Sequence, residues 1–220
     1  MIITIDGPAG SGKSTVARKL AAHLEIPYLD TGAMYRALAY AALRAGIDVS
    51  DDAALHRFAE KVQLAVDCGP TFSRVRVDGH DVSEAIRSME VSNVISSVAR
   101  NQAVRQLLVE QQRRVGRRLG SFVTEGRDQG TVVFPDAEFR FVLLADLPMR
   151  AERRYREMVA DGEDVDIKAV TDNLVRRDRV DSKQWEPLLA SGNVPAIDTT
   201  NLSIHQVLDR ILTELGVPGA

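Results

Sequence analysis

Residues 7–15 read GPAGSGKST, which fits the G-x-x-x-x-G-K-[ST] spacing of a phosphate-binding loop, or P-loop. Glycine has no Cβ, so the backbone of such a loop can curl and direct several N–H groups at one anion. Lys13 adds a cation that can reach the β- and γ-phosphates of a nucleotide, and the Ser14 hydroxyl can hold Mg²⁺. The motif predicts a nucleoside-triphosphate site made of Gly7, Pro8, Ala9, Gly10, Ser11, Gly12, Lys13, Ser14 and Thr15.

Arginines beside acidic or hydroxyl residues form a second set of candidate site residues. They fall in three stretches, residues 30–36, 125–131 and 176–181, and the first two follow predicted strands. Ligands bind outside the carboxyl ends of the strands in open α/β sheets, where these two stretches would lie. The guanidinium fork suits phosphate oxygens, and phosphoryl transfer depends mainly on positioning and on neutralising charge. The P-loop and these arginines together predict a phosphotransferase with an anionic acceptor.

Strands and helices alternate along the chain, which predicts a mostly parallel sheet covered by helices. The apolar run Ile2–Ile5 is typical of a strand buried on both faces. Further strands of this sheet are expected at 28–29, 122–124, 139–144 and 196–198. Helical spacing of apolar residues predicts helices at 14–24, 32–44, 89–98, 101–118, 149–158, 167–178 and 204–212. Another short helix should follow a cap within Ser50–Asp52.

The alternation is interrupted between residues 62 and 83, where the apolar period changes. Asp78-Gly79 is a favoured hairpin turn, and we interpret this β-rich segment as an insert. Its short strands are expected at 63–66, 74–77 and 80–82.

Two other features concern the second half of the chain. The least periodic stretches, 162–164 and 182–192, are expected to be mobile loops. Between Arg150 and Lys183, nine basic and nine acidic residues balance each other, which predicts solvated helices with i,i+4 ion pairs rather than a basic patch.

The composition excludes several classes of protein. The chain has 220 residues, 45% of them hydrophobic, and a net charge of −3. It can bury one good-sized core, and it lacks the basic charge of a nucleic-acid binder. No apolar run is long enough for a membrane span, and no signal peptide is expected. Cys68 is the single cysteine, so it can form neither an intrachain disulfide nor a cysteine metal cluster, and a semi-buried role is expected. We therefore expect a cytoplasmic protein.

The motifs also carry a resemblance to a known family. The matching stretches are residues 3–8, 29–36, 81–83 with 86–87, 104–105 with 111–113, 126–137, and 177–178 with 181–182. The block GRDQGTVVFPDA at 126–137 is highly specific, and the likeness runs from residue 2 to about residue 208. In these stretches the chain resembles bacterial cytidylate kinase, of the nucleoside-monophosphate kinase group.

The resemblance implies an α/β fold of the P-loop kinase class. This fold is a three-layer sandwich with a mostly parallel five-stranded sheet covered by helices, a small β-rich insert and a helical lid. The single chain, 1–220, would comprise a core, an acceptor-binding insert and a lid that closes over ATP. The implied boundaries are 1–30, 86–148 and 190–220 for the core, about 31–85 for the insert (β-rich part 62–83), and about 150–188 for the lid.

Roles follow for residues at matching positions only. The residues implied to hold the acceptor's phosphate are Thr31, Tyr35, Arg36 and Arg127. Those implied to read the cytosine are Ser96, Arg105 and Asp128, and those near the ribose and the transferring phosphoryl group are Arg177 and Asp181. We expect the catalytic residues to be Lys13, Arg127, Arg177 and Asp181, with Ser14 as the metal ligand.

Physical chemistry supports Asp128, because a carboxylate can accept a hydrogen bond from the exocyclic amino group of cytosine. Uracil has a carbonyl there and would leave the carboxylate unpaired, at a cost of about 1–3 kcal/mol. One position departs from the family pattern: the usual arginine three residues after Asp181 is Gln184. Lys183 beside it can supply a charge but no bidentate grip, and Trp185 is unexpected there.

The implied reaction is transfer of the γ-phosphoryl group of ATP to CMP or dCMP, with Mg²⁺, in pyrimidine nucleotide metabolism. The second pKa of the acceptor's phosphate lies near 6, so a strong general base is unnecessary. The four histidines, at 23, 56, 80 and 205, also lie outside every motif. The expected partners are these small molecules, with no nucleic acid and no membrane, and a monomer is the default. Two alternatives stay open: a kinase of another small acceptor, such as thymidylate or shikimate kinase, and an ATP-dependent switch or binding module with little turnover.

Overall fold

The structure is a computed structural model that describes residues 1–160 and 162–217. Its central sheet has five parallel strands in the order β2-β6-β1-β7-β8. These strands are β1 (Ile2–Asp6), β2 (Tyr28–Asp30), β6 (Phe122–Gly126), β7 (Phe139–Leu144) and β8 (Ala196–Asp198). Each overlaps its predicted range, so the predicted five-stranded parallel sheet is confirmed.

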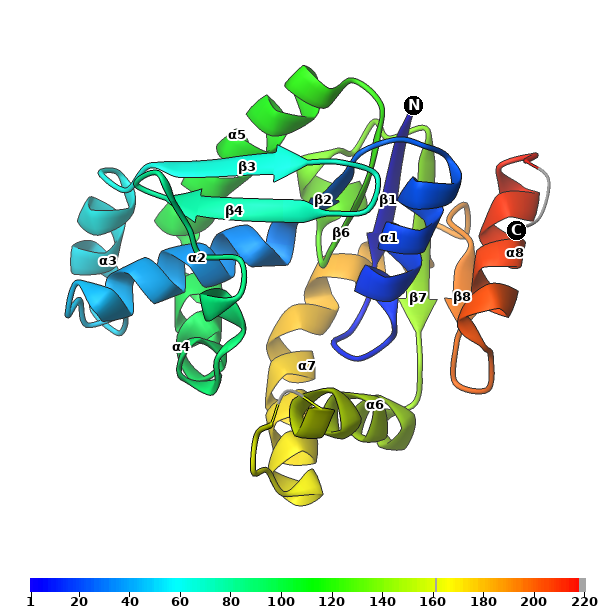
Figure 1. The fold of residues 1–220 in the computed structure, drawn as a ribbon. Helices are drawn as coiled ribbons and strands as arrows, with labels where there is room; N and C mark the ends of the chain where they lie inside the picture. The colour runs from blue at the N-terminus through cyan, green and yellow to red at the C-terminus, as the bar shows by residue number, and fades with distance from the viewer. Residues whose placement is uncertain (161, 218–220) are drawn as a thin grey trace.

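Helices cover both faces of this sheet (Figure 1). One face carries α1 (Lys13–His23) and α8 (Ile204–Glu214); the other carries α2 (Thr31–Arg44), α4 (Met89–Arg100) and α5 (Gln102–Leu119). Neighbouring residues of β6 contribute to opposite cores, Phe122 to the α2–α5 side and Val123 to the α1–α8 side. This alternation follows from the two-residue period of a strand. The predicted three-layer sandwich is therefore confirmed.

The strand register brings several polar segments to one edge of the sheet. Asp6 of β1 is paired with Gly126 of β6, and Asp30 of β2 is paired with Glu125. The P-loop, the start of α2 and the segment after β6 therefore leave the sheet together, at the carboxyl ends of the strands where α/β proteins bind ligands.

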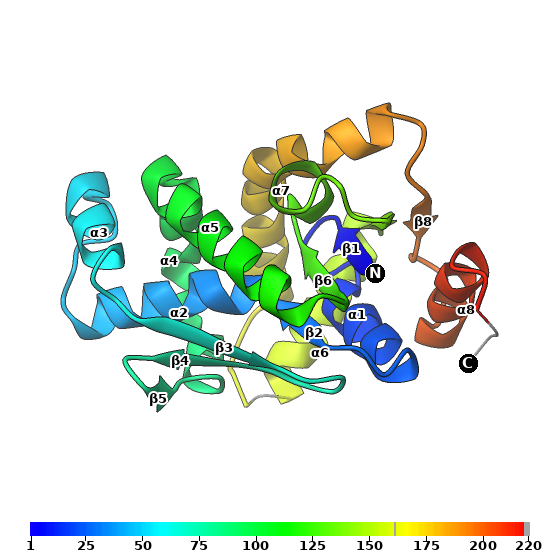
Figure 2. The ribbon, with the colours of Figure 1, turned by 90° about the horizontal axis from the view of Figure 1, so that it is seen from above.

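A second, antiparallel sheet contains β3 (Leu64–Cys68), β4 (Ser73–Val77) and β5 (His80–Asp81), which confirms the three short strands predicted here. Asp78 and Gly79 both have positive φ, 49° and 85°, as a tight two-residue hairpin turn requires. This sheet packs against α2, and α3 (Asp52–Ala59) lies near the far end of α2. Figure 2 shows that α3 and α8 lie at opposite ends of the molecule. The predicted cap is Asp51, which accepts from the N–H groups of Ala53 and Ala54.

Beyond the strand ends lie α6 (Leu147–Ala160) and the first part of α7 (Ile167–Ala190), whose last part returns to the sheet (Figure 1). The sequence predicted that the second of these helices ends near residue 178 and that a mobile loop spans 182–192. That prediction is wrong for residues 182–190, which continue α7. The reason is an apolar face: Trp185 and Leu188, three residues apart, pack against Val142 of the central sheet. The unexpected tryptophan therefore joins α7 to the core.

The implied division into core, insert and lid stays a prediction. Residue 161 of the implied lid and residues 218–220 of the implied core lie outside the described residues. Cys68 is partly buried, as expected. Among the helices of the described residues, none is long and apolar enough to cross a membrane.

Candidate active site

The P-loop connects β1 to α1, and its backbone needs glycine. Gly7, Gly10 and Gly12 have φ of 138°, 77° and 89°, a region that residues with a Cβ rarely adopt. A Cβ on Gly7 would also lie 2.1 Å from the carbonyl oxygen of Leu143 in β7. The loop therefore sits tightly against the sheet, and α1 begins directly after Gly12, with its positive end toward the loop.

Lys13 is buried at the base of this loop, with 4% of its surface exposed. Its Nζ donates a hydrogen bond to the carbonyl oxygen of Pro8 at 2.6 Å. Burial lowers the pKa of Lys13 from 10.5 to about 7, and the charges of Arg127 and Arg177 act in the same direction. Glu125 and Asp6 oppose that shift, but the two arginines and burial outweigh them. A buried cation with other cations nearby favours a bound anion, so the environment of Lys13 fits the phosphates of a nucleotide.

Oxygen atoms that suit Mg²⁺ gather next to the loop. The Ser14 hydroxyl donates to Oε1 of Glu125 at 2.9 Å, and Asp30 lies nearby. Burial raises the pKa of Asp30 to about 6, and the charge of Glu125 acts in the same direction. Mg²⁺ usually binds one or two carboxylates together with substrate phosphates and water. These three side chains fit such a site, although no cluster of three His, Cys, Asp or Glu side chains occurs among residues 1–160 and 162–217.

Four arginines from different elements converge on the same side of the loop. Arg36 of α2 donates to the Ser92 hydroxyl at 3.0 Å, and Arg127, after β6, donates to Oδ2 of Asp181 at 3.1 Å. The pKa of Arg36 and of Arg177 is lowered to about 10, mainly by burial and also by the charges of Arg127 and Arg154. Such mutually unfavourable charges create a strong site for anions.

The residues implied to read a base form a second group. Arg105 of α5 is paired with Asp128, which follows Arg127 in the chain and is buried. Burial raises the pKa of Asp128, and the Arg105 charge opposes that shift. The pKa of Tyr35 is raised by burial and by the nearby Asp128. The structure thus brings Arg105, Asp128 and Tyr35 together, whereas Ser96 is exposed on α4, one turn after Ser92.

Thr31 has a hydrogen-bond partner that lies 94 positions away in the chain. Its hydroxyl donates to the carbonyl oxygen of Glu125 at 2.7 Å, and the residue is buried. Since a hydroxyl has one proton, Thr31 joins α2 to β6 in this conformation. Its contact with a phosphate stays a prediction.

Several charged residues near the site were missed because their partners are distant in the chain. Asp6, fully buried at the end of β1, accepts from the N–H groups of Gln129 and Gly130 at 2.8 and 2.7 Å. It thereby holds the π-helical turn η2 (Gln129–Val133), which directly follows Arg127 and Asp128. Burial raises the pKa of Asp6 to about 7.

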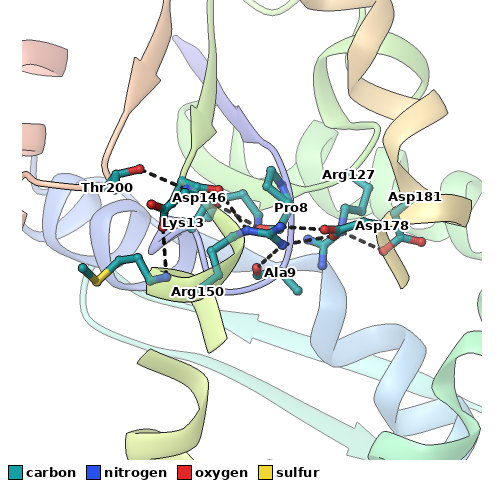
Figure 3. Close-up of polar contacts among 12 residues, drawn as sticks. Pro8, Ala9, Lys13, Arg127, Asp146, Arg150, Asp178, Asp181 and Thr200 are labelled. Carbon is teal, nitrogen blue, oxygen red and sulfur yellow. Dashed lines mark hydrogen bonds and ion pairs between the residues drawn. The ribbon is translucent and has the colours of Figure 1, made fainter. Parts of the chain in front are cut away.

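Not all charged residues between positions 150 and 183 lie on solvated helix surfaces. Exposed i,i+4 pairs do occur, Glu152 with Arg156 and Lys168 with Asp172, as predicted. Arg150, however, is buried and pairs with Asp178 across the two helices (Figure 3). The prediction of solvated helices is wrong for this pair, because opposite charges from different helices meet at the P-loop.

A cavity of about 540 Å³ opens beside the P-loop, and Arg36, Arg127 and Arg177 are not among its lining residues. It lies between the start of α1, α6 and the segment joining β8 to α8, and its lining includes Gly12, Arg153 and Leu202. Arg153 donates to the carbonyl oxygen of Thr199 at 2.6 Å, and the Thr199 hydroxyl donates to the carbonyl oxygen of Ser11 at 3.0 Å. The P-loop therefore borders this cavity as well as the group of arginines described above.

A P-loop at the strand ends, with a lysine at its base and arginines facing it, defines a P-loop phosphotransferase. The structure of shikimate kinase from Bacteroides thetaiotaomicron has the same fold, with a TM-score of 0.52 over 99% of both chains at 12% identity.

The family model described as cytidylate kinase matches residues 3–216, and the chain belongs to that family. A curated cytidylate kinase of Clostridioides difficile (strain 630) is 39% identical, over 99% of both chains. That of Bacillus subtilis (strain 168) is 43% identical, over 96% of this chain and 94% of the relative. The chain is thus a nucleoside-monophosphate kinase, and the resemblance carried by its motifs is confirmed.

Proposed function

We propose that this enzyme transfers the γ-phosphoryl group of ATP to CMP or dCMP, giving ADP and CDP or dCDP. The observation that carries the assignment is that two neighbouring residues just after β6 face different groups of side chains. Arg127 faces Asp181, Lys13 and the other arginines, whereas Asp128 faces Arg105 and Tyr35. One short segment can therefore hold the phosphate and the base of one nucleotide at the same time.

In the donor site, the amides of the P-loop and Lys13 hold the triphosphate, and the cavity next to Gly12 and Arg153 receives the adenosine. Ser14, Glu125 and Asp30 would hold Mg²⁺. Bound there, Mg²⁺ would neutralise charge on the β- and γ-phosphates. The protein's own contribution is to align the γ-phosphate with the acceptor and to hold Lys13 at the base of the loop, where bound phosphate would favour its protonated form.

In the acceptor site, Arg36 and Arg127 hold the monophosphate, with Tyr35 and Thr31 as further candidates. The monophosphate is already largely dianionic near pH 7, so it can attack without a general base. Arg177 on α7 supplies positive charge to the oxygens of the group in transfer. Asp181 holds Arg127 ready for the acceptor through the bond between them.

Base selection rests on Asp128 and Arg105, with Ser96 at the exposed rim. The buried Asp128 carboxylate can accept from the amino group of cytosine, whereas the uracil carbonyl would face it with no proton to share. The preference for CMP over UMP is therefore set by one carboxylate, and the choice between CMP and dCMP is left to contacts with the ribose.

The decisive experiment is a coupled ADP-release assay with Mg²⁺–ATP and a panel of CMP, dCMP, UMP, dTMP, AMP and shikimate. We expect rapid turnover with CMP and dCMP, slower turnover with UMP, and none after chelation of Mg²⁺ by EDTA. Turnover that is strongest with dTMP or shikimate would instead support a kinase of another small acceptor. Slow ADP release that no acceptor accelerates would support an ATP-dependent switch. The cytoplasmic location, the monomeric state and the place in pyrimidine nucleotide metabolism stay predictions.

A further inference from the structure

Arg150 is a buried charged residue that the proposed reaction does not use. It lies on α6, and 5% of its surface is exposed. Its Nε donates to the carbonyl oxygen of Ala145 at 3.0 Å, and its Nη1 donates to that of Ala9 at 3.2 Å. Nη1 and Nη2 also reach both carboxylate oxygens of Asp178, at 3.1 and 2.6 Å. A buried charge is tolerated only with such partners, and these partners join the P-loop to α6 and α7 (Figure 3).

The bond to Ala9 acts directly on the P-loop backbone. In a planar trans peptide the C=O of Ala9 and the N–H of Gly10 point in opposite directions. By holding the Ala9 oxygen, Arg150 turns the Gly10 N–H away from its own guanidinium group. A Cβ on Gly10 would lie 2.9 Å from the carbonyl oxygen of Arg150 and 3.0 Å from its Cβ, so the loop and α6 are in close contact. Rotation of this peptide would aim a carbonyl dipole where phosphate oxygens are expected.

Asp178 fixes the guanidinium that makes this bond. The two-point contact sets both the position and the plane of the Arg150 fork, which a single contact would leave free to turn. Asp178 is three residues from Asp181 on α7, so the two carboxylates lie on one side of that helix. Asp178 engages the donor loop through Arg150, and Asp181 engages the acceptor site through Arg127.

We propose that Arg150 and Asp178 are positioning residues for the donor site, which hold the Ala9–Gly10 peptide in the orientation that binds triphosphate. This inference builds on the proposed function, because it assumes that the P-loop holds the phosphoryl donor. It assigns neither residue a contact with either substrate. The ion pair between Arg150 and Asp178 also fixes the position of α7, which carries Arg177, relative to the P-loop.

Two conservative variants test the proposal. Asp178→Asn keeps the shape of the side chain but removes its charge, and Arg150→Lys keeps the charge but cannot reach Ala9 and Asp178 together. We expect each to weaken binding of Mg²⁺ with the non-hydrolysable β,γ-imido analogue of ATP by roughly tenfold or more, measured by isothermal titration calorimetry. The dissociation constant of CMP should change less than twofold. The double variant should bind the analogue no worse than the weaker single variant, because both changes break one unit.

The matched control is Asp172→Asn, the same change on the same helix, where Asp172 is exposed and pairs with Lys168 at 3.5 Å. It should leave both dissociation constants within twofold of the wild type. Thermal unfolding of all variants, followed by circular dichroism, separates the two roles. A merely structural pair would lower the melting temperature while the folded variants bind the analogue normally, and that result would overturn the proposal.

Equal weakening of CMP and of the ATP analogue would also overturn it, as would full affinity in Arg150→Lys. These outcomes differ from failure of the proposed function. That failure would appear as wild-type protein that binds the ATP analogue but does not release ADP when CMP is added. The binding measurements then still decide what Arg150 and Asp178 do.

Discussion

The donor and acceptor sites are built in different ways. The donor site is made mainly of main-chain groups from one run of nine residues, shaped by glycines and backed by β7. The acceptor site consists of side chains from distant elements, among them Arg36, Arg105, Arg127 and Asp181, and most of these charges already have partners within the protein. The donor cradle is therefore set by backbone geometry, and the acceptor site by a balance of charges.

This difference has a consequence for binding. Backbone amides cannot be neutralised or rotated away without changing the loop, so the donor site is preorganised. In the acceptor site, a nucleotide shares Arg127 with Asp181 and competes with Arg105 for Asp128. When a ligand replaces an internal partner, each buried charged group of the site must find a hydrogen-bonding group on the ligand. A charged group that finds none stays desolvated and unpaired, so the affinity depends on how well the ligand's groups match those of the site. We therefore expect the donor site to determine rate and the acceptor site to determine specificity.

The donor side should show the largest effect on turnover. Lys13→Ala removes the cation at the base of the loop, and we expect kcat to fall by on the order of 10²-fold or more. The control is Lys19→Ala, on an exposed part of the same helix, which should retain normal turnover. Near-normal kcat in purified, folded Lys13→Ala would break the comparison, because the donor site would then not determine rate.

The next prediction concerns the close approach of the P-loop backbone at Gly7 to β7. Gly7→Ala adds a Cβ within 2.1 Å of the Leu143 carbonyl oxygen at φ 138°. We expect a loss of unfolding free energy of about 1–3 kcal/mol, measured by urea denaturation, together with weaker ATP binding. Gly79→Ala is the matched control, since its φ is +85° but nothing lies within 4 Å of the added atom. If both variants lose the same stability and bind ATP equally, φ strain alone matters, and the tight seating of the loop does not.

These two sites also differ in how far the sequence alone could predict them. The P-loop is contiguous, so its spacing and the following helix were sufficient. The parallel sheet was predictable because buried strands form short apolar runs between amphipathic helices. Asp6 was missed as a site residue, because its partners Gln129 and Gly130 are brought to it only by the pairing of β1 with β6.

Arg150 and the end of α7 show the same limit. Arg150 meets Ala9, which is 141 positions away in the chain, and no local pattern marks that contact. Trp185 and Leu188 occur among charged residues and next to Pro187, so the stretch has the composition of a loop. It is helical because the sheet offers Val142 as a packing surface. Tertiary contacts decide both cases, and they are invisible to periodicity.

On the acceptor side, Asp128→Asn should change specificity more than rate. We expect the preference for CMP over UMP, as the ratio of the two kcat/KM values, to narrow by about 1–3 kcal/mol, because the amide can donate to the uracil carbonyl. Asp136→Asn, an exposed change eight residues later, should leave the ratio unaltered. If Asp128→Asn lowers kcat for both nucleotides equally, Asp128 does not select the base.

We expect the smallest effect on ATP binding from the electrostatic interaction between the two sites, in which Arg127 and Arg177 lower the pKa of Lys13. Burial, with Arg127 and Arg177, lowers that pKa to about 7, and phosphate binds the protonated amine. Raising the pH through 7 should therefore weaken binding of the β,γ-imido ATP analogue with excess Mg²⁺, by about fivefold between pH 7 and pH 8 if one proton is involved. Because the charge of Arg127 lowers the pKa of Lys13, Arg127→Gln should raise that pKa and move the loss of affinity to higher pH. The control Lys19→Ala should leave the pH of this loss unchanged. A profile that is identical in wild type and Arg127→Gln would mean that the acceptor arginines do not act on Lys13. Rate and specificity would then reside in two electrostatically independent sites.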